Sequence, residues 1–362
     1  MKKINETMTV NEPLQIQVDK IVNVIKKNFD NIAKEMIKQI STCRPGQCAY
    51  NRSIFYYNDF NLDPDVVQFK SIDVQYYVLY CESTKDVELL FGMMMSCWYD
   101  LNTKIVTLRI PVAYYGGKLY LCVETSVASL AHELLHCFQQ NKKSFNDNSV
   151  AYSFALKTAY NQKEFEHFVN NYKNEFDFLI NVNYDDVKWI LSALYFFDKR
   201  EIDANSQRLY REGMNVYKKS TQNSDNKSLR KTFYYIKNES NLYREFENKC
   251  NEIERCYIKY KDDKYVNEFI DFLFAGSVTS VDKFKKWITT RIEYAKRKFD
   301  KVIWYIITQD IMDAALIEGD RYSLFGDQTN SYGVFESSYY AFRKFDELEN
   351  IQKSRESFIK YF

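Results

Sequence analysis

The first long run of regularly spaced apolar residues covers 15–40 and predicts an amphipathic helix. Ile, Val, Phe and Met side chains recur there at intervals of three and four residues, which places them on one face of a helix. The segment 41–47 follows, and its Pro45-Gly46 pair predicts the turn that ends the helix.

The next region, 51–111, is rich in Val, Ile, Tyr and Phe and predicts a small β-sheet. We expect its strands at 53–57, 72–80, 87–98 and 104–111, with a hairpin turn at 100–103. The segment 87–98 also fits a short helix. The last strand stops at Pro111, and because proline cannot donate to a sheet ladder, we expect an edge strand there.

Beyond the β region the pattern is helical. No proline follows Pro111, and proline breaks helix interiors. After Gly116-Gly117 we expect a helix over 123–140, then helices near 150–180, 185–197, 199–218, 228–260, 264–274, 281–315 and 335–360. The predicted fold class is α+β: a small twisted sheet packed on the 123–140 helix, followed by a large, mainly helical C-terminal part.

Charge and composition exclude some partners. The 362 residues include 50 basic and 49 acidic side chains. Charge-driven binding to nucleic acid or to an anionic membrane requires an excess of basic side chains, so we expect neither partner. The chain start lacks the apolar segment of a signal peptide, and no stretch is apolar enough to span a membrane. We therefore expect a cytoplasmic protein whose eight scattered cysteines are reduced.

Two of the three histidines lie in the run His132-Glu133-Leu134-Leu135-His136. At 100° per residue, histidines four positions apart lie roughly 40° from each other on one helix face. The opposite side carries an apolar stripe made of Val123, Val127, Leu130, Ala131, Leu134, Cys137 and Phe138. The histidines are therefore predicted to face away from the core.

This spacing suits a metal-dependent hydrolase. Two imidazoles on successive turns supply two of three protein ligands to zinc, and the fourth position stays open for water. Glu133, about a quarter-turn round the helix, can take a proton from that water and pass it to a leaving amine. The sequence therefore predicts one zinc ion, bound by His132, His136 and a third ligand.

The run Leu130-Ala131-His132-Glu133-Leu134-Leu135-His136 resembles the active-site helix of zincin metallopeptidases. The resemblance implies a helix packed under a small twisted sheet whose edge strand binds an extended peptide. We expect three regions: an N-terminal helical extension at 1–45, a zincin-like metallopeptidase domain at 46–220, and a helical region at 221–362 whose role stays open.

The third ligand distinguishes zincin subgroups. The metzincin pattern needs Gly and His where this chain has Phe138 and Lys142, so that form is excluded. The segment 198–208 resembles the second ligand helix of gluzincins, which makes Glu201 the predicted third ligand. In this segment Ala204 would let the two helices approach closely, and Asn205 could orient a histidine.

Alternatives stay open at two positions. Asp198 and Glu201 also have the spacing of a capping box, in which case His167, or less favourably Glu164 or Glu166, would supply the third ligand. For the residue that stabilises the oxyanion, Tyr210 is predicted, with Tyr195 and Arg208 as alternatives.

The predicted function is a zinc-dependent metallopeptidase, a hydrolase of endopeptidase type, with a peptide or protein substrate and Glu133 as general base and acid. The alternative is a zincin-like structural or interaction protein with little or no proteolysis, for example in a larger phage or bacterial assembly. The sequence does not fix the oligomeric state or the cleavage specificity.

Overall fold

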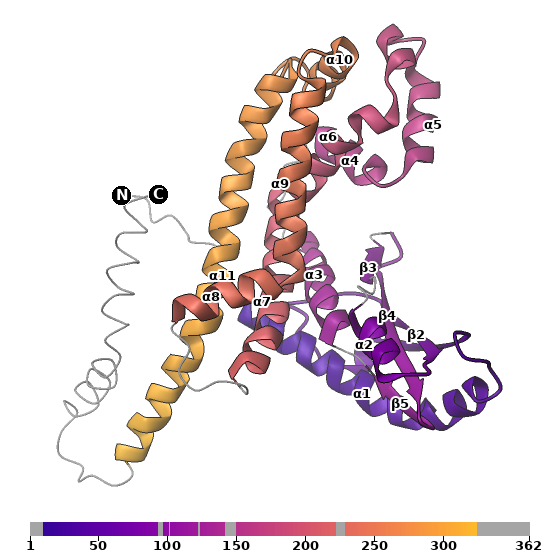
Figure 1. The fold of residues 1–362 in the computed structure, drawn as a ribbon, viewed down its shortest axis with the longest axis vertical. Coiled ribbons are helices and arrows are strands. Elements are labelled where there is room, and N and C mark those ends of the chain that lie inside the picture. Colours follow the sequence, from indigo (N-terminus) through magenta and orange to yellow (C-terminus); the bar gives the residue numbers. More distant parts are fainter. Residues whose placement is uncertain are drawn as a thin grey trace.

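The computed structural model describes residues 10–92, 97–100, 102–121, 124–141, 150–221 and 229–323. These residues form a mixed α+β fold with one five-stranded sheet and many helices. Figure 1 shows the sheet with α1 (Glu12–Ile40) at one end of the molecule and long helices extending away from it. The predicted combination of a small sheet with a large helical part is confirmed.

The first helix, α1, starts at a capping residue and lies along the sheet. The Asn11 side chain accepts a hydrogen bond from the Leu14 amide at 3.1 Å, which satisfies one of the free amides of the first turn. Val18, Ile21 and Ile25 on its apolar face are fully buried in the same cluster as the sheet. The helix predicted over 15–40 is confirmed, and it shares one hydrophobic core with the sheet.

The sheet has the strand order β1-β2-β4-β3, and β5 also pairs with β4. Its strands are β1 (Cys48–Tyr56), β2 (Ser71–Tyr80), β3 (Cys97–Asp100), β4 (Ile105–Tyr115) and β5 (Lys118–Leu121). β2 and β4 run parallel, and the other pairs are antiparallel. Alternate residues of β2 and β4, including Val74, Tyr76 and Ile110, are fully buried against α1 and α3 (Glu124–Asn141).

The segment 87–98 was expected as one strand, and that prediction is wrong. It divides into α2 (Thr84–Gly92) and the start of β3, so the helical alternative holds for its first part. The predicted hairpin turn after β3 is confirmed, because the Lys104 amide donates to the Asp100 carbonyl at 2.8 Å. The Asp100 side chain also accepts from the Asn102 amide at 2.9 Å, which is typical of an Asx-turn.

The expectation that 104–111 forms an edge strand is also wrong, since β4 lies inside the sheet. Pro111 lies opposite Tyr77 of β2. On the other side of β4, the described pairs with β3 reach Leu108 and those with β5 begin at Val112.

The described helical part runs through α4 (Val150–Thr158), α5 (Gln162–Tyr172), α6 (Tyr184–Phe196), α7 (Lys199–Thr221), α8 (Leu229–Glu239), α9 (Asn241–Tyr260), α10 (Lys264–Leu273) and α11 (Val281–Ser323). The stretches expected near 150–180 and 228–260 are interrupted. Asn161 and Ser240 accept hydrogen bonds from amides three residues ahead and so start new helices. The helix predicted over 335–360 lies outside the described residues. None of the helices described combines the length and apolarity that a membrane crossing requires.

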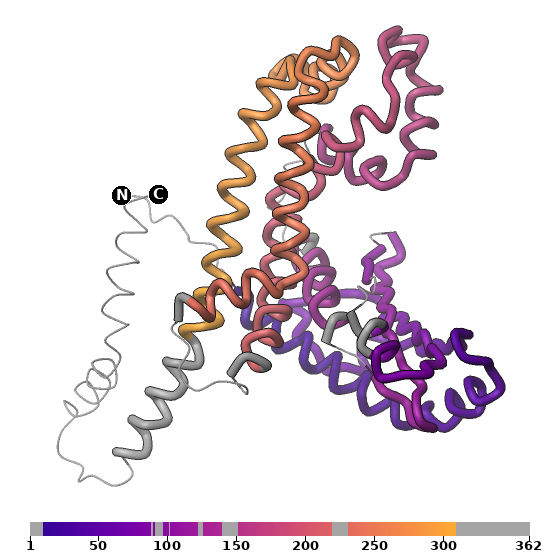
Figure 2. Tube along the Cα trace, in the orientation of Figure 1, coloured from indigo at the N-terminus to yellow at the C-terminus, as the bar shows by residue number. Residues whose placement is uncertain are grey.

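The buried apolar residues form two large clusters that meet at α7. The first joins α1, the sheet and α3 and includes Ala204, while the second joins α4 to α11 and includes Ile202 and Leu209. Apart from Ala204, the change between them along the chain falls between Cys137 and Ala151. Figure 2 shows α7 beside α3, and the fully buried Ala204 permits that close approach.

Candidate metal centre

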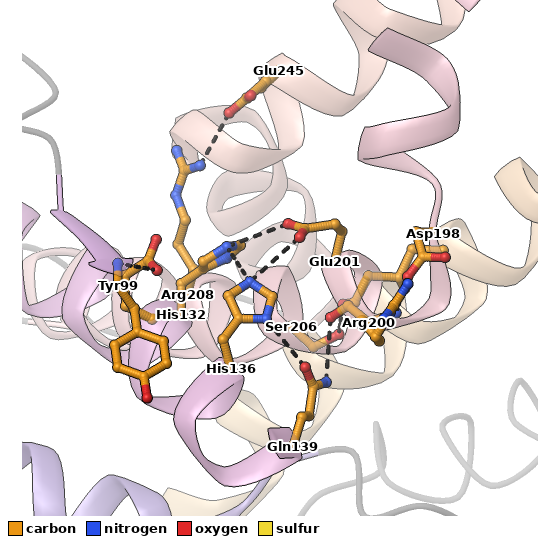
Figure 3. A network of polar contacts seen from close by, with 12 residues as sticks. Tyr99, His132, His136, Gln139, Asp198, Arg200, Glu201, Ser206, Arg208 and Glu245 are labelled. Atoms are coloured by element: carbon orange, nitrogen blue, oxygen red, sulfur yellow. Dashed lines mark hydrogen bonds and ion pairs between the residues drawn. The ribbon is translucent and has the colours of Figure 1, made fainter. Parts of the chain in front are cut away.

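The helix α3 directs its apolar side toward the sheet and two histidines toward α7. Leu130 and Leu134 are fully buried beside the sheet. The side chains of His132 and His136 keep 12% and 20% of their surface exposed, and they face Glu201 in the first turn of α7, which keeps 3% (Figure 3). The predicted helix phase is confirmed for the described residues, which do not include Val123.

The ring nitrogens and the carboxylate converge on one point. His132 Nε2 and His136 Nε2 are 3.1 Å apart, and each lies 3.4 Å from one oxygen of Glu201. A tetrahedral ion about 2.1 Å from its ligands holds them about 3.4 Å from one another. The spacing and the donor set therefore fit, and the three residues form a group that could hold a metal ion.

Gln139 orients one of the two histidines. His136 Nδ1 lies 3.1 Å from Gln139 Oε1, and because an amide oxygen only accepts, Nδ1 carries the proton and Nε2 offers its lone pair to the cluster. The Gln139 amide then donates to the Arg200 carbonyl at 3.4 Å, which joins α3 to the start of α7. This orienting role was expected of Asn205, which makes no hydrogen bond to either histidine within the described structure.

Glu201 is held by a residue from a third helix. The Tyr152 hydroxyl of α4 donates to Glu201 Oε1 at 3.2 Å. Glu201 does not act as the second residue of a capping box, because its carboxylate contacts Tyr152 and the two histidines. The Asp198 side chain accepts a hydrogen bond from the Arg200 amide at 2.9 Å. Burial and the Glu201 charge raise the pKa of Tyr152 well above its ordinary value, so its hydroxyl stays a donor.

His136 and Glu201 form an ion pair when no metal is bound. Burial of His136 opposes protonation, but the charge and hydrogen bond of Glu201, together with Glu133, outweigh it and raise the pKa of His136 to about 9. Burial likewise acts to raise the pKa of Glu201, yet His136 and His132 hold that pKa far below its ordinary value. A proton therefore competes with the metal for His136 near neutral pH.

We expect metal affinity to increase about tenfold per pH unit between pH 7 and 9, because His136 must lose its proton first, and to level off above its pKa of about 9. Titration against a chelator of known pH dependence measures this slope. In the metal-free protein, His136 stabilises the fold below its ordinary pKa of 6.5, and this contribution is lost as the pH rises through about 9. A flat affinity from pH 7 to 9 would contradict the assignment.

Glu133 lies between the cluster and the sheet. Its Oε2 accepts a hydrogen bond from the Tyr99 amide of β3 at 3.0 Å. Burial raises the pKa of Glu133 and the Glu201 charge raises it further, while the two histidines act in the opposite direction. A carboxyl group whose pKa is raised toward neutrality is well suited to take up and return a proton.

The free edge beside the cluster belongs to β3 rather than to 104–111. Tyr99 lies opposite Val106 of β4, yet its amide bonds Glu133 and so points away from β4. Because backbone groups alternate in direction along an antiparallel strand, those of Cys97 also point outward. No described strand pairs with that side of β3.

The other third-ligand candidates lie elsewhere. His167 is exposed on α5, where its Nε2 lies 3.0 Å from the Asn171 amide nitrogen. Glu164 and Glu166 are exposed on the same helix. Figure 1 places α5 near the far end of the helical part, so the structure brings Glu201, and not His167, to the two histidines.

Tyr210, predicted to stabilise the oxyanion, is not brought to the cluster. It lies roughly half a turn round α7 from Glu201 and about 13 Å along the helix. There its ring packs against Tyr305 of α11, with centroids 6.0 Å apart. The alternative Arg208 forms ion pairs with the carboxylates of Glu212 and Glu245 at 2.8 and 3.1 Å.

Tyr195 of α6 is the oxyanion candidate on which the charges of Glu201 and Glu133 act. Burial raises the pKa of Tyr195, and the charges of Glu201 and Glu133 raise it further. Its ring also packs edge-on against Tyr160, with centroids 5.7 Å apart. Sequence reasoning included Tyr195 but missed Tyr152, since no local pattern distinguishes one position among 30 tyrosines.

Comparison with known proteins assigns no family to the chain. No protein-family model matches it, and no curated protein or solved structure matches it significantly. The description of the His132, His136 and Glu201 group therefore rests on the sequence and geometry of this chain.

Proposed function

We propose that this protein is a zinc-dependent metallopeptidase that cleaves a bond within an extended peptide or protein segment. The observation that carries the proposal is the convergence of two imidazoles and one carboxylate, with Glu133 beside them at the free edge of β3. Three protein ligands of this His, His and Glu type, with one position left open, are typical of catalytic zinc sites in hydrolases.

Each residue has a role in the proposed reaction. His132, His136 and Glu201 bind the ion, and zinc when bound supplies Lewis acidity that activates water at neutral pH. Glu133 takes the proton of the attacking water and passes it to the amine nitrogen as the peptide bond breaks. The Tyr99 amide holds Glu133 Oε2, which leaves Oε1 to carry the proton.

The substrate is proposed to lie along β3 in an extended conformation. The outward backbone groups of Cys97 and the carbonyl of Tyr99 can bond a peptide strand, whereas the Tyr99 amide is already occupied by Glu133. Pairing on this edge would present a main-chain carbonyl to Glu133. The preferred substrate is therefore an unfolded or flexible segment.

Tyr195 is proposed to stabilise the oxyanion. Its hydroxyl makes no hydrogen bond to another described residue, and burial together with the charges of Glu201 and Glu133 raises its pKa, which keeps it a donor. We expect Tyr195→Phe to lower kcat about 10²- to 10³-fold, the cost of losing one oxyanion donor, with metal content unchanged. Steady-state kinetics measure this, and Tyr210→Phe, which alters a ring packed on Tyr305, serves as the matched variant. A kcat loss in Tyr210→Phe alone would favour the original assignment.

The proposed function is tested by incubating the protein with a defined mixture of unstructured peptides and identifying the products by mass spectrometry. The expected result is internal cleavage that stops when the metal is chelated and returns when Zn²⁺ is added. Stoichiometric zinc without cleavage of any peptide would support the alternative of a structural or interaction protein.

A further inference from the structure

Tyr152 is the one described side chain, apart from the histidines, that bonds the Glu201 carboxylate. It belongs to α4 and is 7% exposed, and its hydroxyl donates to Glu201 Oε1 at 3.2 Å. The Arg200 guanidinium packs over the face of the Tyr152 ring in a cation–π contact, with its central carbon 3.9 Å from the ring centre. Arg200 is in turn held by Asp198, with Nε and Oδ1 3.0 Å apart. The hydroxyl is therefore held firmly in place.

The two oxygens of Glu201 differ in their surroundings. Oε2 lies 3.4 Å from His132 Nε2 and has no other partner among the described atoms. Oε1 lies 3.4 Å from His136 Nε2 and also accepts the Tyr152 hydroxyl. A donated hydrogen bond draws electron density from the oxygen that accepts it, so Oε2 is the stronger metal donor of the two.

We propose that Tyr152 is a positioning residue that restricts Glu201 to metal binding through Oε2 alone. This inference rests on the metal-binding part of the proposed function and does not depend on peptide cleavage. A carboxylate that binds through both oxygens would fill the position that a catalytic site keeps open. By holding Oε1, Tyr152 keeps the protein ligands at three atoms.

The experiment loads the metal-free full-length chain with one equivalent of Co²⁺ and records its visible absorption. Four-coordinate Co²⁺ absorbs strongly, and the intensity falls as the coordination number rises. We expect intense bands in the native protein and bands at least about twofold weaker per bound Co²⁺ in Tyr152→Phe, because the freed Oε1 joins the metal. Circular dichroism establishes that the variant is folded.

Two further variants make the outcome decisive. Tyr184→Phe is the matched control, because it also removes one tyrosine hydroxyl. The Tyr184 hydroxyl donates to the Ala159 carbonyl at 2.9 Å and not to the cluster. The Co²⁺ spectrum of Tyr184→Phe should therefore equal that of the native protein. Arg200→Met keeps the hydroxyl but frees the Tyr152 ring, and it is expected to weaken the bands in the same direction even if Tyr152→Phe fails to fold.

The results separate this inference from the proposed function. A native chain that binds no Co²⁺ overturns both. If the native chain gives intense bands and these persist in Tyr152→Phe, the positioning role of Tyr152 is wrong, while the metal site is retained. If Tyr152→Phe does not fold, the same conclusion follows from bands that persist in Arg200→Met.

Discussion

Replacing Glu133 with glutamine is expected to lower peptide hydrolysis about 10²- to 10⁴-fold while the bound metal stays in place. Glutamine keeps the size of the side chain and an oxygen that can accept the Tyr99 amide, which lies 3.0 Å from Glu133 Oε2. It cannot take a proton from water. Glu133 is also outside the group of three ligands, so the metal should be unaffected.

The measurement is the rate of cleavage of a peptide that the native protein cuts, together with metal content for each variant. Glu164→Gln is the matched control, because it makes the same chemical change at an exposed position on α5. Full activity in Glu133→Gln would contradict the assigned role. Loss of the metal together with activity would instead make Glu133 a ligand.

Replacing Glu201 with alanine is expected to weaken metal binding by more than the 10- to 100-fold typical of losing a residue that only orients a ligand. The carboxylate lies 3.4 Å from both histidine nitrogens and keeps 3% of its side-chain surface exposed, so the substitution removes one of the three converging ligand groups. His167→Ala changes an exposed side chain that contacts Asn171, and this variant should bind metal as the native chain does.

Equilibrium competition with a chelator measures both variants at one pH. The reverse result, with metal lost in His167→Ala and kept in Glu201→Ala, would contradict the ligand assignment. The removal of Glu201 also takes away the larger of the two charges that raise the pKa of His136, so the pH dependence of any residual binding should shift to lower pH.

Local spacing was sufficient to predict the face of the motif helix. Leu130 and Leu134 recur at helical intervals and are buried, which leaves His132 and His136 on the other side. The approach of Glu201 was expected from the resemblance of 198–208 to the second ligand helix of gluzincins, and small Ala204 is buried where α7 lies against α3. The helix face could be predicted from local spacing because the residues that determine it are near one another in sequence.

The free edge at β3 could not be predicted in the same way. The segment 87–98 is apolar without a clear period, so helix and strand competed. Packing across the chain decided between them: Leu90 of α2 is buried with Cys81 and Ala113 on the sheet. Strand order likewise depends on the parallel pairing of β2 with β4, which no local signal at Pro111 indicates.

The second layer around the ligands was largely hidden as well. Gln139 lies one helical turn after His136, but its bond to the Arg200 carbonyl depends on how α7 packs against α3. Tyr152 reaches Glu201 only because α4 packs in the helical part that also holds α6 and α7. Contacts of this kind are made by tertiary packing, and a single sequence carries no local trace of them.

The most direct test is the metal content of the purified full-length protein, measured by mass spectrometry after extensive dialysis. The proposed site predicts one zinc ion per chain, lost in Glu201→Ala and retained in His167→Ala. A native chain that holds no zinc, even after incubation with Zn²⁺, would contradict the central claim that His132, His136 and Glu201 form a metal centre.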